Sequence, residues 1–191
     1  MKHLIDYSKF WANFPFRPVS KEQVENINFI VRKLNISAKF ILATEYAYIL
    51  ATIKHECGEG YKPIPENLDA PWLRGKELKY AKPDPETGQT YYGRGYVQLT
   101  WKTNYKKLGD AIGMDLSMVP DAALEPEIAW LILEEGMYRG MFTGQALGKY
   151  INEQGTDFYG ARKVINSLDQ AFLIKKYAEQ FLGAIEPKTV T

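Results

Sequence analysis

The chain has few of the residues on which disulfide scaffolds, metal sites and polyanion binding depend. Among its 191 residues there is one cysteine, Cys57, and there are two histidines, His3 and His55. A single cysteine forms no internal disulfide, so the fold is compatible with a reducing compartment. The charges nearly balance, with 24 Lys and Arg against 23 Asp and Glu. No global charge therefore attracts nucleic acid or an anionic membrane, and we expect neither as a partner.

A long uninterrupted apolar run is also missing. The start, MKHLIDYSKFWANF, contains Asp6 and Lys9 where a signal peptide needs its apolar centre, so we expect no export signal. The most apolar stretch, around 40–53, is interrupted by Thr44 and Glu45, which is more typical of a buried helix than of a membrane span. With 46% hydrophobic and 25% charged residues, this length predicts one soluble domain over residues 1–191, a monomer without stable membrane insertion.

Helical periodicity dominates what the sequence does contain. Ser20 and Gln23 match a capping box, followed by apolar residues at helical spacing. Further helices are predicted over 38–56, 100–112, 126–139, 157–166 and 170–185. Between 57 and 99, five prolines and several glycines predict a long irregular segment, with short strand pairing around 91–99. The expected fold is mainly α-helical with at most a short β-hairpin.

Two carboxylates flank the glycine-rich end of the apolar helix. Glu56 would sit at the helix end, where partial burial favours the protonated form that can donate a proton. Glu66, ten residues on, would be a wetter, ionised carboxylate. Glycoside hydrolysis requires such a pair. On spacing alone the simpler interpretation is that Glu56 ends a helix and Glu66 is a solvated loop residue.

The segment GQTYYGRGYVQLTWKTNY, residues 88–105, combines aromatic rings with hydrogen-bonding side chains. Such rings stack on sugars, and amides and hydroxyls bind sugar hydroxyl and acetamido groups. The candidates are Tyr91, Tyr92, Tyr96 and Trp101 for stacking, and Gln98, Thr100 and Asn104 for hydrogen bonding. The alternative is that the tyrosines fill the core and Thr100 caps the helix that follows. Arg94 either sets the charge state of a cleft carboxylate or is a structural ion-pair partner.

Three other functions compete with glycoside hydrolysis as interpretations of these residues. A cysteine peptidase or amidase needs Cys57 as a thiolate, but His55 lies two positions away and so on another face of a helix. A zinc site fails because Glu59 stands where the HExxH pattern needs histidine, so we expect neither a metal nor another cofactor. A non-catalytic sugar-binding module needs neither Glu56 nor Thr100, and their presence argues against it.

Two segments, KHECGEG and YYGRGYVQLTWKTNY, resemble the signatures of glycoside hydrolase family 19, the chitinase family that also includes many bacteriophage endolysins. The likeness continues through AIGMDLSMVPDAALEPEIAW to ARKVINSLD, over roughly residues 40–185. It implies a lysozyme-like, two-lobed helical fold with a sugar-binding cleft. It also implies that Glu56 is the general acid and that Thr100 helps to hold the attacking water. Glu66 fits the second carboxylate best, with Glu77 in reserve.

The resemblance further implies a substrate and a role. The residues expected to bind substrate are His55, Tyr91, Tyr92, Arg94, Gln98, Trp101, Asn104 and Asn166. The compact form without an export signal is most similar to phage endolysins, which predicts an inverting, lysozyme- or muramidase-like peptidoglycan hydrolase for host lysis. Such an enzyme would accumulate in the host cytoplasm before it acts on the bacterial cell wall. The alternative is a chitinase acting on chitin oligomers.

Overall fold

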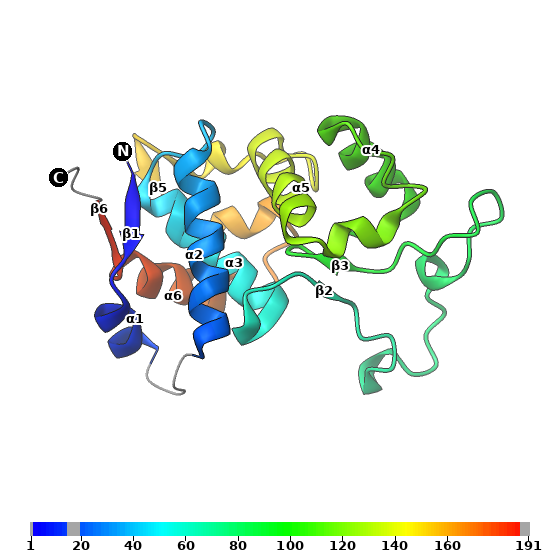
Figure 1. Cartoon of the computed structure of the whole chain (residues 1–191), viewed down its shortest axis with the longest axis horizontal. Coiled ribbons are helices and arrows are strands. Elements are labelled where there is room, and N and C mark those ends of the chain that lie inside the picture. The colour runs from blue at the N-terminus through cyan, green and yellow to red at the C-terminus, as the bar shows by residue number, and fades with distance from the viewer. Residues whose placement is uncertain (1, 15–19, 188–191) are drawn as a thin grey trace.

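A computed structural model describes residues 2–14 and 20–187. Its described part is mainly α-helical, as predicted (Figure 1). The α-helices are α1 (Tyr7–Asn13), α2 (Lys21–Ile36), α3 (Ala43–Cys57), α4 (Lys102–Ile112), α5 (Pro126–Arg139) and α6 (Ala171–Leu182). In Figure 1 the first three helices and α6 gather on one side, α4 lies on the other, and β2 and β3 run between them. Within the described ranges no helix is both long and apolar enough to cross a membrane.

The central helix is α3, which is buried on every side over residues 45–54. It packs chiefly against α6, and α2 lies alongside it. A helix that is apolar all round must be surrounded by other elements, as the sequence predicted. The packing leaves the C-terminal end of α3 as the part that meets the irregular segment. Gly58, with a φ of 67°, ends the helix there.

Several helix ends follow from local chemistry. The capping box of α2 is present, because Ser20 Oγ accepts from the Gln23 backbone N–H at 3.1 Å and Gln23 Oε1 accepts from that of Ser20 at 2.6 Å. Helix α5 spans the predicted residues, with Pro126 in its first turn. Helix α4 ends as predicted at Gly113, whose φ of 73° is the left-handed conformation that glycine adopts without strain.

Other predicted bounds were wrong. Helix α3 begins at Ala43 rather than at residue 38, because the Glu45 carboxylate accepts from the backbone N–H groups of Ile41 and Leu42 and fixes the first turn there. Thr100 does not cap α4; Trp101 occupies that position without a side-chain capping bond. The helix predicted over 157–166 is a single 3-10 segment, η6 (Gly160–Val164).

The strands form three antiparallel pairs where the sequence predicted at most one hairpin. They are β1 (His3–Ile5) with β6 (Ile185–Pro187), β2 (Ile64–Pro65) with β3 (Arg94–Gly95), and β4 (Ile151–Asn152) with β5 (Gly155–Thr156). The pairing expected around 91–99 is real: β3 lies there, and Arg94 forms an antiparallel bridge with Leu99. Strand β3, which lies within the irregular segment, also contacts the end of α3 through Gly95 and Cys57.

Candidate active site

The chain segments that carry the two candidate carboxylates both contact β3 or the residue before it. Glu56 lies in the last turn of α3, and the thiol of the next residue, Cys57, lies 3.5 Å from the carbonyl oxygen of Gly95. Glu66 follows β2 directly, and its backbone N–H donates to the Gly93 carbonyl at 2.7 Å. Because β2 and β3 are hydrogen-bonded to each other, the helix end and the loop carboxylate are brought to one region of the molecule.

Glu56 is held by a residue that the sequence did not single out. Arg162 Nη1 donates to Glu56 Oε1 at 2.6 Å, and Arg162 Nε donates to the Asp169 carbonyl at 2.9 Å. The arginine side chain is 3% exposed and the Glu56 side chain 15% exposed. The prediction considered only the burial of Glu56 and did not include this ion pair. No local pattern marked Arg162, since its partner is 106 residues away.

Glu66 is half-buried and has two hydrogen-bond donors. Tyr80 donates its hydroxyl to Oε1 at 2.9 Å, and the Gly93 backbone N–H donates to Oε2 at 3.0 Å. Both contacts are donated to the carboxyl group, whose two oxygens accept them. Burial, with the neighbouring Glu66 carboxylate, raises the pKa of Tyr80 to about 12, so the phenol keeps its proton. Tyr80 is a second site residue that the sequence prediction missed.

The backbone around Gly93 packs tightly against this carboxylate. A Cβ added at Gly93 would lie 2.7 Å from Gln98 Oε1 and 3.3 Å from Glu66 Cβ, so a larger residue would displace one of them. Gln98 has a φ of 52° and donates from Nε2 to the Ile64 carbonyl at 3.0 Å. At Gly93, protein groups therefore approach one another closely. Gln98 and Glu66 both lie next to Gly93, so Gln98 is near the candidate base.

The predicted stacking residues lie in different environments. Trp101 is 48% exposed and meets Tyr80 edge-on, with ring centroids 5.2 Å apart. Tyr91 is 3% exposed, and its hydroxyl donates to the Ser117 carbonyl at 2.8 Å, so its ring is not free to stack on a sugar. Tyr92 is half-buried beneath the Arg94 guanidinium, whose carbon lies 3.6 Å from the ring centroid. Of these three aromatic residues, only Trp101 has an exposed ring that also contacts Tyr80, the hydroxyl donor to Glu66.

Arg94 is a structural residue in this arrangement. It is 2% exposed, and its Nε donates to Asp121 at 2.7 Å. Its Nη1 donates to the carbonyls of Thr90 and Tyr92 at 3.0 and 3.2 Å. None of these contacts reaches a candidate carboxylate. Of the two alternatives left open by the sequence, the structural ion pair is the one observed.

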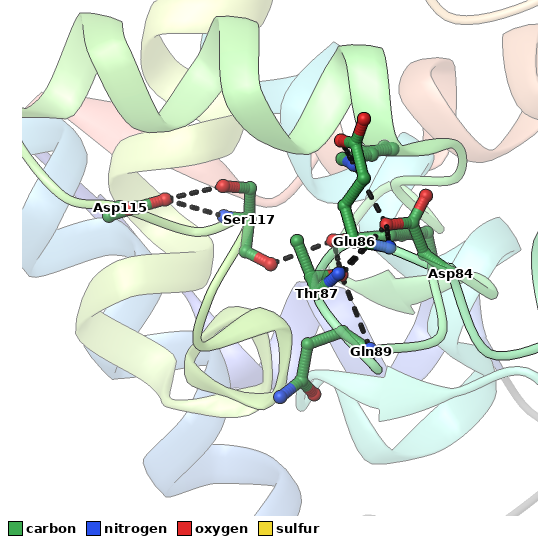
Figure 2. A network of polar contacts seen from close by, with 8 residues as sticks. Asp84, Glu86, Thr87, Gln89, Asp115 and Ser117 are labelled. Carbon is green, nitrogen blue, oxygen red and sulfur yellow. Dashed lines mark hydrogen bonds and ion pairs between the residues drawn. The ribbon is translucent and has the colours of Figure 1, made fainter.

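Turns on either side of Tyr91 are fastened by short polar side chains. Figure 2 shows that Asp84 accepts from the Thr87 backbone at 3.0 Å and that Asp115 accepts from the Ser117 backbone at 3.1 Å. The Tyr91 hydroxyl lies 2.7 Å from Thr87 Oγ1 and so joins the two turns. The Tyr91 backbone N–H also donates to the Tyr80 carbonyl. The network therefore helps to hold Tyr80, whose hydroxyl donates to Glu66.

The other predicted residues contact neighbouring groups of the protein. Thr100 is half-buried, and its carbonyl accepts from Asn104 Nδ2 at 2.9 Å, so Asn104 supports the start of α4. Asn166 is exposed, and its backbone N–H donates to the Arg162 carbonyl at 3.0 Å. His55 is half-buried beside Glu56. Glu77, the reserve base, is exposed and accepts from Lys82 at 2.5 Å, a contact that lowers its pKa. The roles of these residues remain predictions.

The pKa of His55 lies below its ordinary value of 6.5, chiefly because the half-buried ring is desolvated. A histidine whose pKa is lowered by folding binds a proton more readily in the unfolded chain. Its contribution to stability is present above pH 6.5 and is lost as the pH falls through the folded-state pKa. We expect the urea midpoint to fall between about pH 7 and about pH 5, and His55→Gln to flatten that dependence. An unchanged slope in the variant would place the acid sensitivity in other groups.

Cys57 behaves as a small buried side chain rather than as a nucleophile. It is 7% exposed, and burial raises the pKa of its thiol well above the ordinary value. Because the thiolate is the reactive form, we expect the folded protein to resist iodoacetamide at neutral pH. Cys57→Ser should keep its activity within about twofold, because serine retains the small polar donor. Inactivation by serine substitution without unfolding would support a thiol mechanism.

Other parts of the described chain offer no competing centre. Among residues 2–14 and 20–187, no group of three or more His, Cys, Asp or Glu side chains is arranged to hold a metal ion. Cavities of 280 and 320 Å³ lie elsewhere, the first between α1, α3 and α6 and the second beside the start of α3. Neither is lined by a predicted site residue. The candidate site therefore rests on side-chain contacts and coincides with neither cavity.

Known proteins with similar sequences are chitinases. Residues 74–132 match the family described as Chitinase class I, glycoside hydrolase family 19. Chitinase 3 of Oryza sativa subsp. japonica is 38% identical over 90 residues, which are 40% of this chain and 27% of the rice protein. Endochitinase CH25 of Brassica napus is 35% identical over 99 residues, 45% of this chain and 30% of the relative. The matched regions thus span less than a third of these relatives.

Similarity of fold extends over nearly the whole chain. Chitinase C from Streptomyces griseus HUT6037 matches with a TM-score of 0.59 and 23% identity, covering 94% of this chain and 93% of that one. A bacterial family 19 chitinase matches with a TM-score of 0.52 and 22% identity, covering 97% and 98%. At these identities the likeness shows the fold alone, and it confirms the predicted lysozyme-like helical class. The chain is therefore similar to glycoside hydrolase family 19 in sequence over residues 74–132, and to family 19 chitinases in fold over most of its length.

Proposed function

We propose that the protein is a glycoside hydrolase that cleaves β-1,4 bonds between N-acetylhexosamine units, with Glu56 and Glu66 as its acid and base. The observation that carries the proposal is the contrast between the two carboxylates. Glu56 is held at a helix end by the buried Arg162, and Glu66 is held in a loop by Tyr80 and the Gly93 backbone. Two carboxyl groups in different environments are what a division between acid and base requires.

The proposed reaction is a single displacement with inversion. Glu56 donates its proton to the glycosidic oxygen as the bond to the anomeric carbon breaks. Glu66, with the Thr100 hydroxyl, holds a water and takes its proton as the water oxygen bonds to that carbon from the opposite face. Arg162 keeps Glu56 directed toward the bond and stabilises the carboxylate that remains after proton transfer. Trp101 offers a face for a sugar ring next to Glu66.

Chitin oligomers are the substrate that we propose first, because the similar proteins are named chitinases. The endolysin role expected from the sequence, with peptidoglycan as substrate and the host cytoplasm as the site of accumulation, is the second candidate. It rests on the compact form of the resembling family members. Both polymers present N-acetylglucosamine units, which the proposed residues alone do not distinguish.

Digestion of chitin oligomers and of purified peptidoglycan in parallel, with mass spectrometry of the products, tests the proposal. Shortened chitin oligomers alone would support the chitinase function. Fragments with muramic acid at the reducing end would identify a muramidase and favour the endolysin role. If purified, folded protein cleaves neither polymer while a family 19 chitinase does so in the same assay, the proposed function is wrong.

The stereochemistry of the product provides an independent prediction. Inverting pairs need room for a water, with carboxyl groups roughly 6.5–9.5 Å apart, whereas retaining pairs lie about 5–5.5 Å apart. We expect the new reducing end to appear first as the α-anomer, detected by proton NMR before mutarotation. A β-anomer in the earliest spectra would indicate a covalent intermediate or assistance by the substrate.

A further inference from the structure

Two hydroxyl groups lie behind the Glu56–Arg162 pair and have no role in the mechanism described so far. Tyr48, Thr52 and Glu56 follow one another at intervals of four along α3. Residues four apart lie on the same face of a helix, so the three side chains form one row that leads from the core to the proposed acid. The first two are fully buried.

Neither hydroxyl makes a well-formed hydrogen bond within the described part of the chain, although Thr52 lies close enough for a weak contact between the two hydroxyls to lower the pKa of Tyr48. Burial raises the pKa of the Tyr48 phenol, so it remains a neutral hydroxyl. The charges that act on it are those of Arg162, Glu56 and Asp157. Its ring lies parallel to that of Phe158, four residues before Arg162, with centroids 6.2 Å apart. The row on α3 is thus packed against the segment that carries the guanidinium.

A buried hydroxyl without a partner costs about 1–3 kcal/mol, so two in one row call for a physical reason. Arg162 has five N–H groups, and within the described residues its recorded partners are Glu56 and the Asp169 carbonyl. Buried polar groups that lack a direct partner are commonly satisfied by ordered water, which makes about three hydrogen bonds. The two hydroxyls and the remaining guanidinium N–H groups are complementary, since hydroxyl oxygens accept and the guanidinium only donates.

We propose that Tyr48 and Thr52 are positioning residues, whose hydroxyls are linked by enclosed water to Arg162 and hold its guanidinium against Glu56. The catalytic part of this inference rests on the proposed function, because it assumes that Glu56 is the acid. The structural part does not, since a water-linked network has consequences for stability whatever the reaction. The two parts are tested separately.

The structural part is tested with Thr52→Val and Tyr48→Phe, which keep the shape of each side chain and remove the hydroxyl. If the hydroxyls are networked, each substitution breaks hydrogen bonds to buried partners, and both variants should unfold at lower urea than the parent. If the hydroxyls are unsatisfied, their removal relieves a desolvation cost and raises the midpoint. A crystal structure that resolves ordered water should show a water in contact with both hydroxyls and Arg162. A raised midpoint in both variants, or a dry site, overturns the proposal.

The catalytic part is tested by steady-state kinetics on chitin oligomers. Thr52→Val should lower kcat about two- to tenfold, the effect of one lost hydrogen bond, with little change in KM. Thr52→Ser keeps the hydroxyl and should restore kcat. The control is Tyr61→Phe, which removes another buried hydroxyl that has no partner in the described chain and lines the cavity beside α1. Its kcat should be unchanged.

The outcomes separate the two hypotheses. A parent protein without activity on either polymer contradicts the proposed function, while the stability and crystallographic results still decide whether the network exists. An active parent whose Thr52→Val and Thr52→Ser variants show the same kcat contradicts the positioning role. Equal losses in Thr52→Val and Tyr61→Phe would also contradict it, because the effect would then be a general response to core substitution.

Discussion

Replacement of Glu56 by glutamine should lower kcat on chitin oligomers by about 10²- to 10⁴-fold, the usual contribution of a general acid. The amide keeps the size of the carboxyl group and can still accept a hydrogen bond from Arg162. It has no proton to donate to the leaving oxygen. Binding of oligomers, measured by calorimetry, should be nearly unchanged, so the loss appears in kcat and not in KM.

Stability must be followed in the same variant, because Glu56→Gln leaves the buried Arg162 without its counter-charge. We expect a lower denaturation midpoint but a folded protein at the assay temperature, checked by circular dichroism. Glu179→Gln is the matched control, since it removes an exposed carboxylate from α6. A folded Glu56→Gln variant with near-normal turnover would remove Glu56 from the mechanism.

The second large effect is expected at Glu66. Glu66→Gln should lower kcat by about 10²- to 10⁴-fold, because an amide does not take the proton of the attacking water. Glutamine also replaces one acceptor oxygen by an NH₂ group, so either the Tyr80 hydrogen bond reverses its direction or the Gly93 hydrogen bond is lost. Thr100→Ala should have a smaller effect on kcat, since it removes only a hydrogen bond to the water.

Glu77→Gln is the matched control for the base. Glu77 lies in the same irregular segment but is exposed and paired with Lys82. Surface pairs of this kind contribute little, so the variant should keep its activity within about twofold. If Glu77→Gln loses turnover and Glu66→Gln does not, Glu77 is the base and the irregular segment must rearrange when substrate binds.

The parts of the fold that the sequence predicted are those set by neighbouring residues. The capping box of α2 needs only Ser20 and Gln23, and the stop of α4 needs only a glycine at residue 113. The incorrect helix bounds arose where contacts that the apolar pattern does not reveal determine the structure. The apolar pattern around residue 40 reads as helix, yet Phe40 packs in the core ahead of α3, and the Glu45 carboxylate fixes where the helix begins.

In the candidate site, too, residues marked by a local sequence pattern were predicted, and residues brought in by folding were not. Glu56 and Glu66 were identified from spacing and resemblance, both of which are local properties of the sequence. Arg162 and Tyr80 were missed because each meets its carboxylate only in the folded chain, across 106 and 14 residues of sequence respectively. Tyr91 was predicted to face substrate, but a tyrosine pattern does not reveal which ring is covered by the turns at Thr87 and Ser117.

The pairing of β1 with β6 has a consequence for how the molecule is made. Ile5 lies opposite Ile185, so β1 cannot form this pair until β6 has been synthesised. Helices α2 and α3 are close in sequence and can associate while synthesis continues, whereas this strand pair closes a loop that contains all six of the described α-helices. Until β6 is available, β1 is an unpaired strand edge. The nascent protein is therefore most exposed to intermolecular pairing before β6 has been made.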